Sequence, residues 1–195
     1  MSELLEFAKG PLFRFCFAIM LLGLLRLFIL ALINGFEAKS KAKDKAIPKG
    51  YVRKMTIGFL LPIRAFRVKP VYAIVSILFH IGLILTPLLL FDHALLFSKS
   101  IGFSWLAITL GKHTADWLTI MTIITGIILV IMRIGSRISR FISRKQDFTW
   151  PLLLIVPFIT GLVCAQFSKK PDTYNYFMLI HVLIGCLIFI IMPFT

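Results

Sequence analysis

Apolar residues gather into five long runs along this chain, separated by shorter polar or basic stretches. Each run can cross the hydrocarbon core of a bilayer, about 30 Å thick, as a helix of roughly 20 residues. We place the runs at about 11–34, 71–96, 114–134, 149–167 and 174–194. The first run lacks the basic head and cleavage site of a secretory signal, so we expect it to stay uncleaved. The pattern predicts an all-α integral membrane bundle of five transmembrane helices, forming a single domain over 1–195.

Composition agrees with a membrane location and argues against a nucleic-acid-binding protein. Hydrophobic residues make up 59% of the chain and charged residues only 15%, which is too apolar for a soluble globule of this length. The formal net charge of +14 is therefore better explained by basic loops that flank apolar spans.

The basic residues are divided unequally between the two sides of the membrane. Fifteen Lys and Arg lie in the connections 35–70 and 133–145, whereas the opposite side holds five, Lys9, Lys99, Lys112, Lys169 and Lys170. Because basic loops stay in the cytoplasm, we expect the N-terminus outside and the C-terminus inside. The second half of the basic cytoplasmic loop 35–70 mixes aromatic and basic residues, which suits a segment in the headgroup plane, anchored to anionic lipid or docking a partner.

Four histidines carry the candidate chemistry, and two of them, His80 and His181, lie inside apolar runs. An ionisable side chain at membrane depth is costly and is by default a functional candidate. Counting about 1.5 Å per residue places His93 and His181 at similar depth on antiparallel helices. Two facing imidazoles are the axial ligands of a six-coordinate b-type haem. Zinc would need further ligands, for which Asp92 is the nearest candidate.

His80 has no histidine at its own depth, so a core histidine bonded to a carbonyl is its structural alternative. It is also about 140° from His93 around a straight helix, at 100° per residue. Pro87 lies between the two and favours a kink that would bring them onto one face.

Charged residues near these histidines are the next candidates. Arg14 and Arg26 lie in the first run; both can reach the interfaces, and Arg26 is deep enough to pair with a haem propionate. His113 is either a solvated interfacial histidine or part of a quinone site near the outer haem. There, acids and bases could pass protons during quinol oxidation, namely Asp92, Lys112 and Asp116. Three cysteines, Cys16, Cys164 and Cys186, are interpreted as packing residues.

Several segments resemble one family of membrane cytochromes. SILFHIGLILTPLLLFDH (76–93), TADWLTI, PFITGLVCAQ and LIHVLIGCLIFIIMPFT at the end resemble the membrane cytochrome b subunit, the gamma subunit, of respiratory nitrate reductases. They look closer still to the related small subunits in transmembrane redox complexes of sulfate-reducing and sulfur-oxidising microbes. The similarity covers roughly residues 70–195.

The resemblance implies a five-helix bundle in the cytoplasmic membrane of a prokaryote, with two b haems that exchange electrons with the (mena)quinone pool. It assigns His80 to the cytoplasmic-side haem and His181 to the outer haem. His93 matches the second ligand of the second span in kind, although its spacing is longer than in the nitrate reductase subunit. The family continues PFT with a further histidine that completes the cytoplasmic-side haem; we expect a tail after Thr195 to supply it.

Two function classes follow, with a third possibility of a structural anchor without cofactors. The first is a dihaem b-type cytochrome subunit that transfers electrons between quinone and partner redox subunits, an electron-transfer part of an oxidoreductase complex. Its partners would be a cytoplasmic iron–sulfur or catalytic subunit and an extracytoplasmic multihaem cytochrome c. The alternative is a proton or ion pathway subunit of a transporter without haem, in which His80 and His181 relay protons.

Overall fold

The computed structural model describes residues 2–41, 50, 63–102 and 106–194. These ranges form helices joined by short connections, without a named strand. Five of its helices are long and apolar enough to cross a membrane: Ser2–Ala38, Pro70–Leu89, Lys112–Gly135, Gln146–Gln166 and Pro171–Phe194. The all-α fold with five candidate spans, predicted from the apolar runs, is therefore confirmed.

The first span is longer than its apolar run. α1 (Ser2–Phe7) continues through a π-helical turn, η1 (Ala8–Leu12), into α2 (Phe13–Lys41). We expected this span to end near residue 34, but the helix runs on to Lys41, where the ammonium pairs with Glu37 one turn earlier at 3.2 Å. Such pairs support an exposed helix. Most of the predicted headgroup segment lies outside the described residues, which resume at α4 (Ile63–Val68).

The other helices begin and end at residues suited to those positions. They are α5 (Pro70–Leu89), α6 (Phe91–Ile101), η2 (Leu106–Ile108), α7 (Lys112–Gly135), α8 (Arg137–Ile142), α9 (Gln146–Gln166), α10 (Pro171–Ile191) and η3 (Met192–Phe194). Pro70 and Pro171 open α5 and α10, where the missing N–H costs no helical hydrogen bond. Gly102, at a φ of 73°, ends α6 in the left-handed conformation that glycine adopts without strain.

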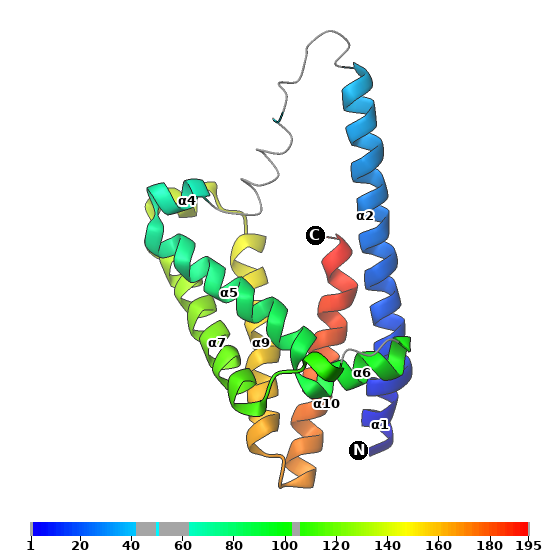
Figure 1. Cartoon of the computed structure of the whole chain (residues 1–195). Coiled ribbons are helices and arrows are strands. Elements are labelled where there is room, and N and C mark those ends of the chain that lie inside the picture. The colour runs from blue at the N-terminus through cyan, green and yellow to red at the C-terminus, as the bar shows by residue number, and fades with distance from the viewer. Residues whose placement is uncertain (1, 42–49, 51–62, 103–105, 195) are drawn as a thin grey trace.

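The long helices pack side by side in the order α5, α7, α9, α10 and α2 (Figure 1). One core joins α5, α7 and α9 through Phe79, Leu129 and Ile155. The second joins α2 to α10 and includes Cys16 and Cys186, whose thiols form a hydrogen bond with each other. α6 packs against this second core through Leu96 and Phe97. It therefore links the end of α5 to the first span.

Basic residues are more numerous at one end of this row of helices than at the other. Figure 1 shows α4, α8 and the C-terminal end of α2 at one end, here called the α4 end, and α1, α6 and the α9–α10 connection at the other, the α6 end. Among residues with described side chains, the α4 end holds Lys41, Arg67, Lys69, Arg133, Arg137, Arg140, Arg144 and Lys145, and the α6 end holds Lys9, Lys99, Lys112, Lys169 and Lys170. The described parts of both basic connections thus share one end, as predicted.

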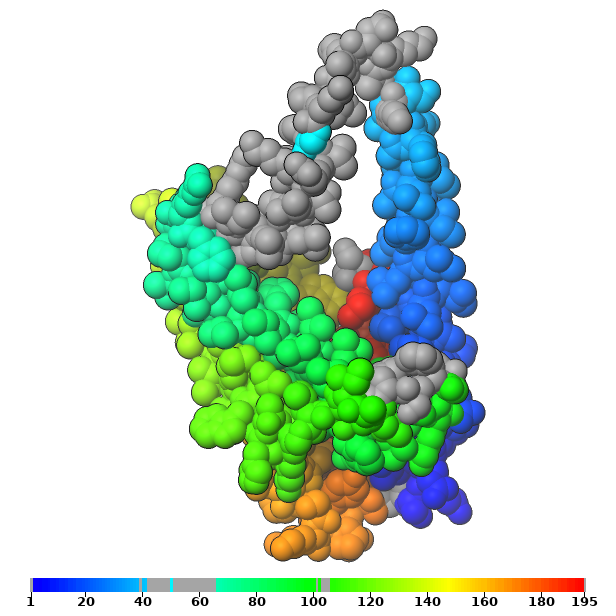
Figure 2. All heavy atoms as spheres, in the orientation of Figure 1, coloured from blue at the N-terminus to red at the C-terminus, as the bar shows by residue number. Residues whose placement is uncertain are grey.

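The C-terminal half of α2 has few neighbours in the described chain. Its large apolar side chains are exposed, with Phe28 at 60% and Phe36 at 71%. Figure 2 shows this light-blue part of the helix rising beyond the other helices. An apolar helix surface of this size is stable only against lipid or another protein.

Candidate functional site

His93 and His181 lie together at the α6 end. Their ring centroids are 5.8 Å apart and the ring planes differ by 16°. His93 comes from the first turn of α6 and His181 from the middle of α10. Two residues 88 positions apart in the chain therefore present their imidazoles to each other. The depth count from the sequence predicted this juxtaposition.

A helix break, rather than a kink, brings His93 into place. We expected one span over 71–96, and that boundary is wrong because α5 ends at Leu89. Leu90 is extended, with φ −66° and ψ 129°, and α6 starts at the next residue. Leu110 donates its backbone N–H to the Leu89 carbonyl at 2.8 Å, which fixes the break. The angle of about 140° between His80 and His93 was estimated for one straight helix. It does not apply here, because the two residues lie on different helices.

Hydrogen bonds from α9 orient the His181 ring. Nδ1 lies 3.0 Å from Thr160 Oγ1, and that hydroxyl already lies 3.1 Å from the Val156 carbonyl and 3.2 Å from the Pro157 carbonyl as a donor. The single hydroxyl hydrogen is directed at a carbonyl, so the Thr160 oxygen accepts from Nδ1–H. This tautomer leaves Nε2 with its lone pair available to a metal ion.

Space for the His181 ring depends on Gly161, a residue of α9. A Cβ at Gly161 would lie 3.2 Å from Cε1 of His181, closer than ordinary van der Waals contact. Gly161 therefore allows α10 and its imidazole to approach α9. Sequence reasoning did not single out Thr160 or Gly161, although both follow Pro157 within one helical turn.

The surroundings of His93 favour its neutral form. Burial lowers the pKa of the His93 imidazole, while a hydrogen bond to the Pro87 carbonyl acts in the opposite direction. Because desolvation penalises the charged ring, the imidazole stays neutral near neutral pH. A neutral imidazole is the form that binds a metal ion.

His80 occupies a separate site on α5. Its Nδ1 lies 2.7 Å from the Ser76 carbonyl one turn earlier, which again directs one nitrogen to the backbone and leaves Nε2 available. It precedes Leu90 by ten residues, or about 15 Å along the helix. The two histidine sites therefore lie at different depths.

A cavity opens beside His80 between α5, α7 and α9. Its volume is about 180 Å³, and it is lined mainly by apolar side chains with a few polar groups: Tyr72, Ser76, Phe79, His80, Leu83, Leu129, Val130, Arg133, Asp147, Trp150, Pro151 and Leu154. A neighbouring hollow of about 430 Å³ shares five of these residues and adds Gln146 and Met192. An apolar cavity with a few convergent polar groups is typical of a ligand site.

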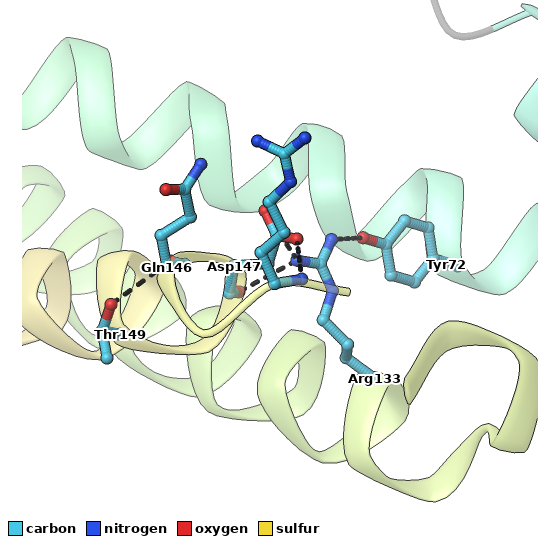
Figure 3. A network of polar contacts seen from close by, with 6 residues as sticks. Tyr72, Arg133, Gln146, Asp147 and Thr149 are labelled. Atoms are coloured by element: carbon cyan, nitrogen blue, oxygen red, sulfur yellow. Dashed lines mark hydrogen bonds and ion pairs between the residues drawn. The ribbon is translucent and has the colours of Figure 1, made fainter. Parts of the chain in front are cut away.

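Arg133 lines this cavity, and Figure 3 shows its polar contacts. Nη1 donates to the Asp147 backbone carbonyl at 2.9 Å and Nη2 donates to the Tyr72 hydroxyl at 3.2 Å. Asp147 Oδ1 is 3.9 Å from Nη1, and Oδ2 accepts the Arg144 backbone N–H at 2.8 Å. The sequence analysis counted Arg133 only as a loop charge; its spacing from buried Gly126 and Val130 was the signal that it faces inward.

Five of the other six predicted residues lie at the α6 end, and Arg26 lies at neither site. Arg14 is exposed, and its Nη2 lies 3.5 Å from the Lys99 carbonyl at the α6 end. Arg26 is exposed on α2 and lines neither cavity. The proposed quinone residues reach the α6 end with Asp116 half-buried and three exposed, Asp92, Lys112 and His113. Within the described ranges, no hydrogen bond joins any of these four to the histidine pair.

The described residues hold no group of three or more His, Cys, Asp or Glu side chains placed to bind a metal ion. A site for a bare ion such as zinc would need such a group. A metal carried in a macrocycle needs only axial ligands from the protein. The histidine pair can offer two imidazole nitrogens to a metal ion.

Comparisons with known proteins give sequence similarity without a function. A protein of Nitratidesulfovibrio vulgaris (strain Hildenborough), described only as a protein, is 31% identical over 131 residues, which cover 67% of this chain and 56% of the relative. The match thus spans little more than half the relative's length. No family model matches the chain, and no solved structure matches it.

Proposed function

We propose that this chain is a b-type cytochrome subunit with two haems, which exchanges electrons between the membrane quinone pool and partner redox subunits. The observation that carries the proposal is the His93–His181 pair. An imidazole nitrogen lies about 2 Å from a metal that it binds, so rings on opposite sides of one iron have centroids about 6 Å apart. The observed separation is 5.8 Å.

Both imidazoles have the surroundings that axial ligands require. His181 Nδ1 is held by Thr160, and His93 is bonded to the Pro87 carbonyl. Such outer hydrogen bonds fix ring orientation and raise ligand basicity. When bound, haem b supplies one-electron transfer; the protein contributes ligation, orientation and the electrostatic environment.

His80 is the proposed ligand of the second haem. Its Nδ1 is bonded to the Ser76 carbonyl, and its cavity is largely apolar, with Arg133 at the far side. The second axial ligand of this haem is not among the described histidines.

The proposal includes a topology and a membrane. We place the basic α4 end in the cytoplasm of a prokaryotic cell, because Lys and Arg are retained there, which puts the N-terminus outside. The basic surface suits a cytoplasmic iron–sulfur or catalytic subunit with acidic contacts. Quinone would be oxidised or reduced near the α6 end, where Asp92, His113 and Asp116 are available for proton transfer.

A difference spectrum of the purified full chain tests the proposal. We expect b-type bands in the dithionite-reduced minus oxidised spectrum, and a pyridine haemochrome assay should give two haems per chain. A colourless protein with an intact helical circular dichroism spectrum would refute haem binding and favour the ion-pathway alternative. One haem per chain, lost on His181→Ala, would retain the histidine pair and remove His80 from the proposal.

A further inference from the structure

We infer that Arg133 binds the carboxylates of the porphyrin ligated by His80, with Tyr72 and Asp147 as the residues that position it. This inference rests on the proposed function and identifies an anion site within it. Arg133 and His80 line one cavity, from α7 and α5 respectively. Among the described lining residues Arg133 is the only arginine, so it is the group that would hold the anionic groups of a ligand bound by His80.

Hydrogen bonds hold the Arg133 guanidinium in place but do not use all of its N–H donors. Arginine has five N–H donors in a planar fork, and two contacts, to Asp147 and Tyr72, are made here. The remaining N–H groups can donate to a carboxylate, which binds arginine through paired, charge-assisted hydrogen bonds. The side chain is 29% exposed, so its charge acts in a partly desolvated setting, where it is screened less than at an open surface.

Neighbouring charges leave Arg133 as the group directed at the cavity. Asp147 lies at 3.9 Å, but its other carboxylate oxygen is engaged by the Arg144 backbone N–H. Figure 3 shows Tyr72 and Asp147 approaching the guanidinium from different elements, so the side chain is held at its tip. Arg26, which the sequence suggested as a propionate partner, does not line this cavity.

The sign of the effect on the haem potential follows from charge. Reduction of the iron adds one negative charge, and a nearby cation favours that state. Loss of Arg133 leaves the porphyrin carboxylates uncompensated and favours the oxidised form. The midpoint potential of the His80-dependent centre should therefore fall in Arg133→Gln, whereas that of the other centre should stay unchanged.

Redox titration of membranes containing the full chain tests the assignment. His80→Ala first identifies which centre depends on His80. Arg133→Gln should then shift that centre alone to lower potential or reduce its occupancy, and Arg133→Lys should give a smaller change because it keeps the charge but not the fork. Tyr72→Phe should also shift it slightly. Arg137→Gln, an equal charge change outside the cavity, is the matched control.

Each outcome separates this inference from the proposed function. Two normal centres in Arg133→Gln, with unmoved potentials, overturn the role of Arg133 and leave the cytochrome proposal standing. The same result with loss of quinol oxidation would assign the cavity to a quinone headgroup. A wild-type chain whose one centre depends on His181 and not on His80 overturns the role of Arg133 and the count of two haems, and leaves the His93–His181 centre standing. Retention of the His181-dependent centre reports that a variant is folded.

Discussion

His181→Ala and His93→Ala should each remove the same one of the two haem centres. A six-coordinate haem needs both imidazoles, and the two rings lie 5.8 Å apart without another described histidine beside them. Haem content should fall from two to one per chain, and low-spin b bands of one potential should disappear. The measurement is a potentiometric titration followed by absorption, with a haemochrome assay for content.

His113→Ala is the control for this pair of variants, since His113 is exposed at the start of α7. It should keep both centres. His80→Ala should remove the centre that remains in His181→Ala. If His93→Ala and His181→Ala instead affected different centres, the pairing across α6 and α10 would be wrong, although haem binding itself would still hold.

The spans were predictable because apolar length is a local property of the sequence. Predicted spans 114–134 and 149–167 agree with α7 and α9 to within three residues at each end. The end of α5 was not predictable in this way. Residues 70–96 remain apolar through the break, and Pro87 is tolerated within membrane helices. The break at Leu90 is fixed by Leu110, which lies on a connection after α6.

In the candidate site, too, features set by the local sequence were predicted and features set by contacts between helices were not. Depth counting along one continuous span predicted His93 at the level of His181. The break at Leu90 did not undo this, because His93 is only three residues beyond it. Thr160 and Gly161 were not found, because their roles depend on the contact between α9 and α10. Arg133 was missed for a related reason: its partner Tyr72 is 61 residues away. The haem itself remains a prediction.

Gly82→Ala should destabilise the protein strongly, because α5 and α7 meet at this residue. A Cβ at Gly82 would overlap Thr122 Oγ1 and would lie 3.2 Å from the Leu118 carbonyl oxygen, a backbone atom. Overpacking of this kind typically costs about 1–3 kcal/mol, and sometimes more. The midpoint of thermal or denaturant unfolding in detergent, followed by circular dichroism, should fall accordingly.

Gly185→Ala provides the matched control within α10. A Cβ there meets nothing within 4 Å, so the intrinsic preference of helices for alanine, up to about 1 kcal/mol, should leave stability unchanged or raised. Thr122→Ala in the Gly82→Ala background should recover part of the loss, since it removes the overlapping oxygen, and a double-mutant cycle measures that coupling. Equal stability of Gly82→Ala and Gly185→Ala would show that α5 and α7 are further apart than described.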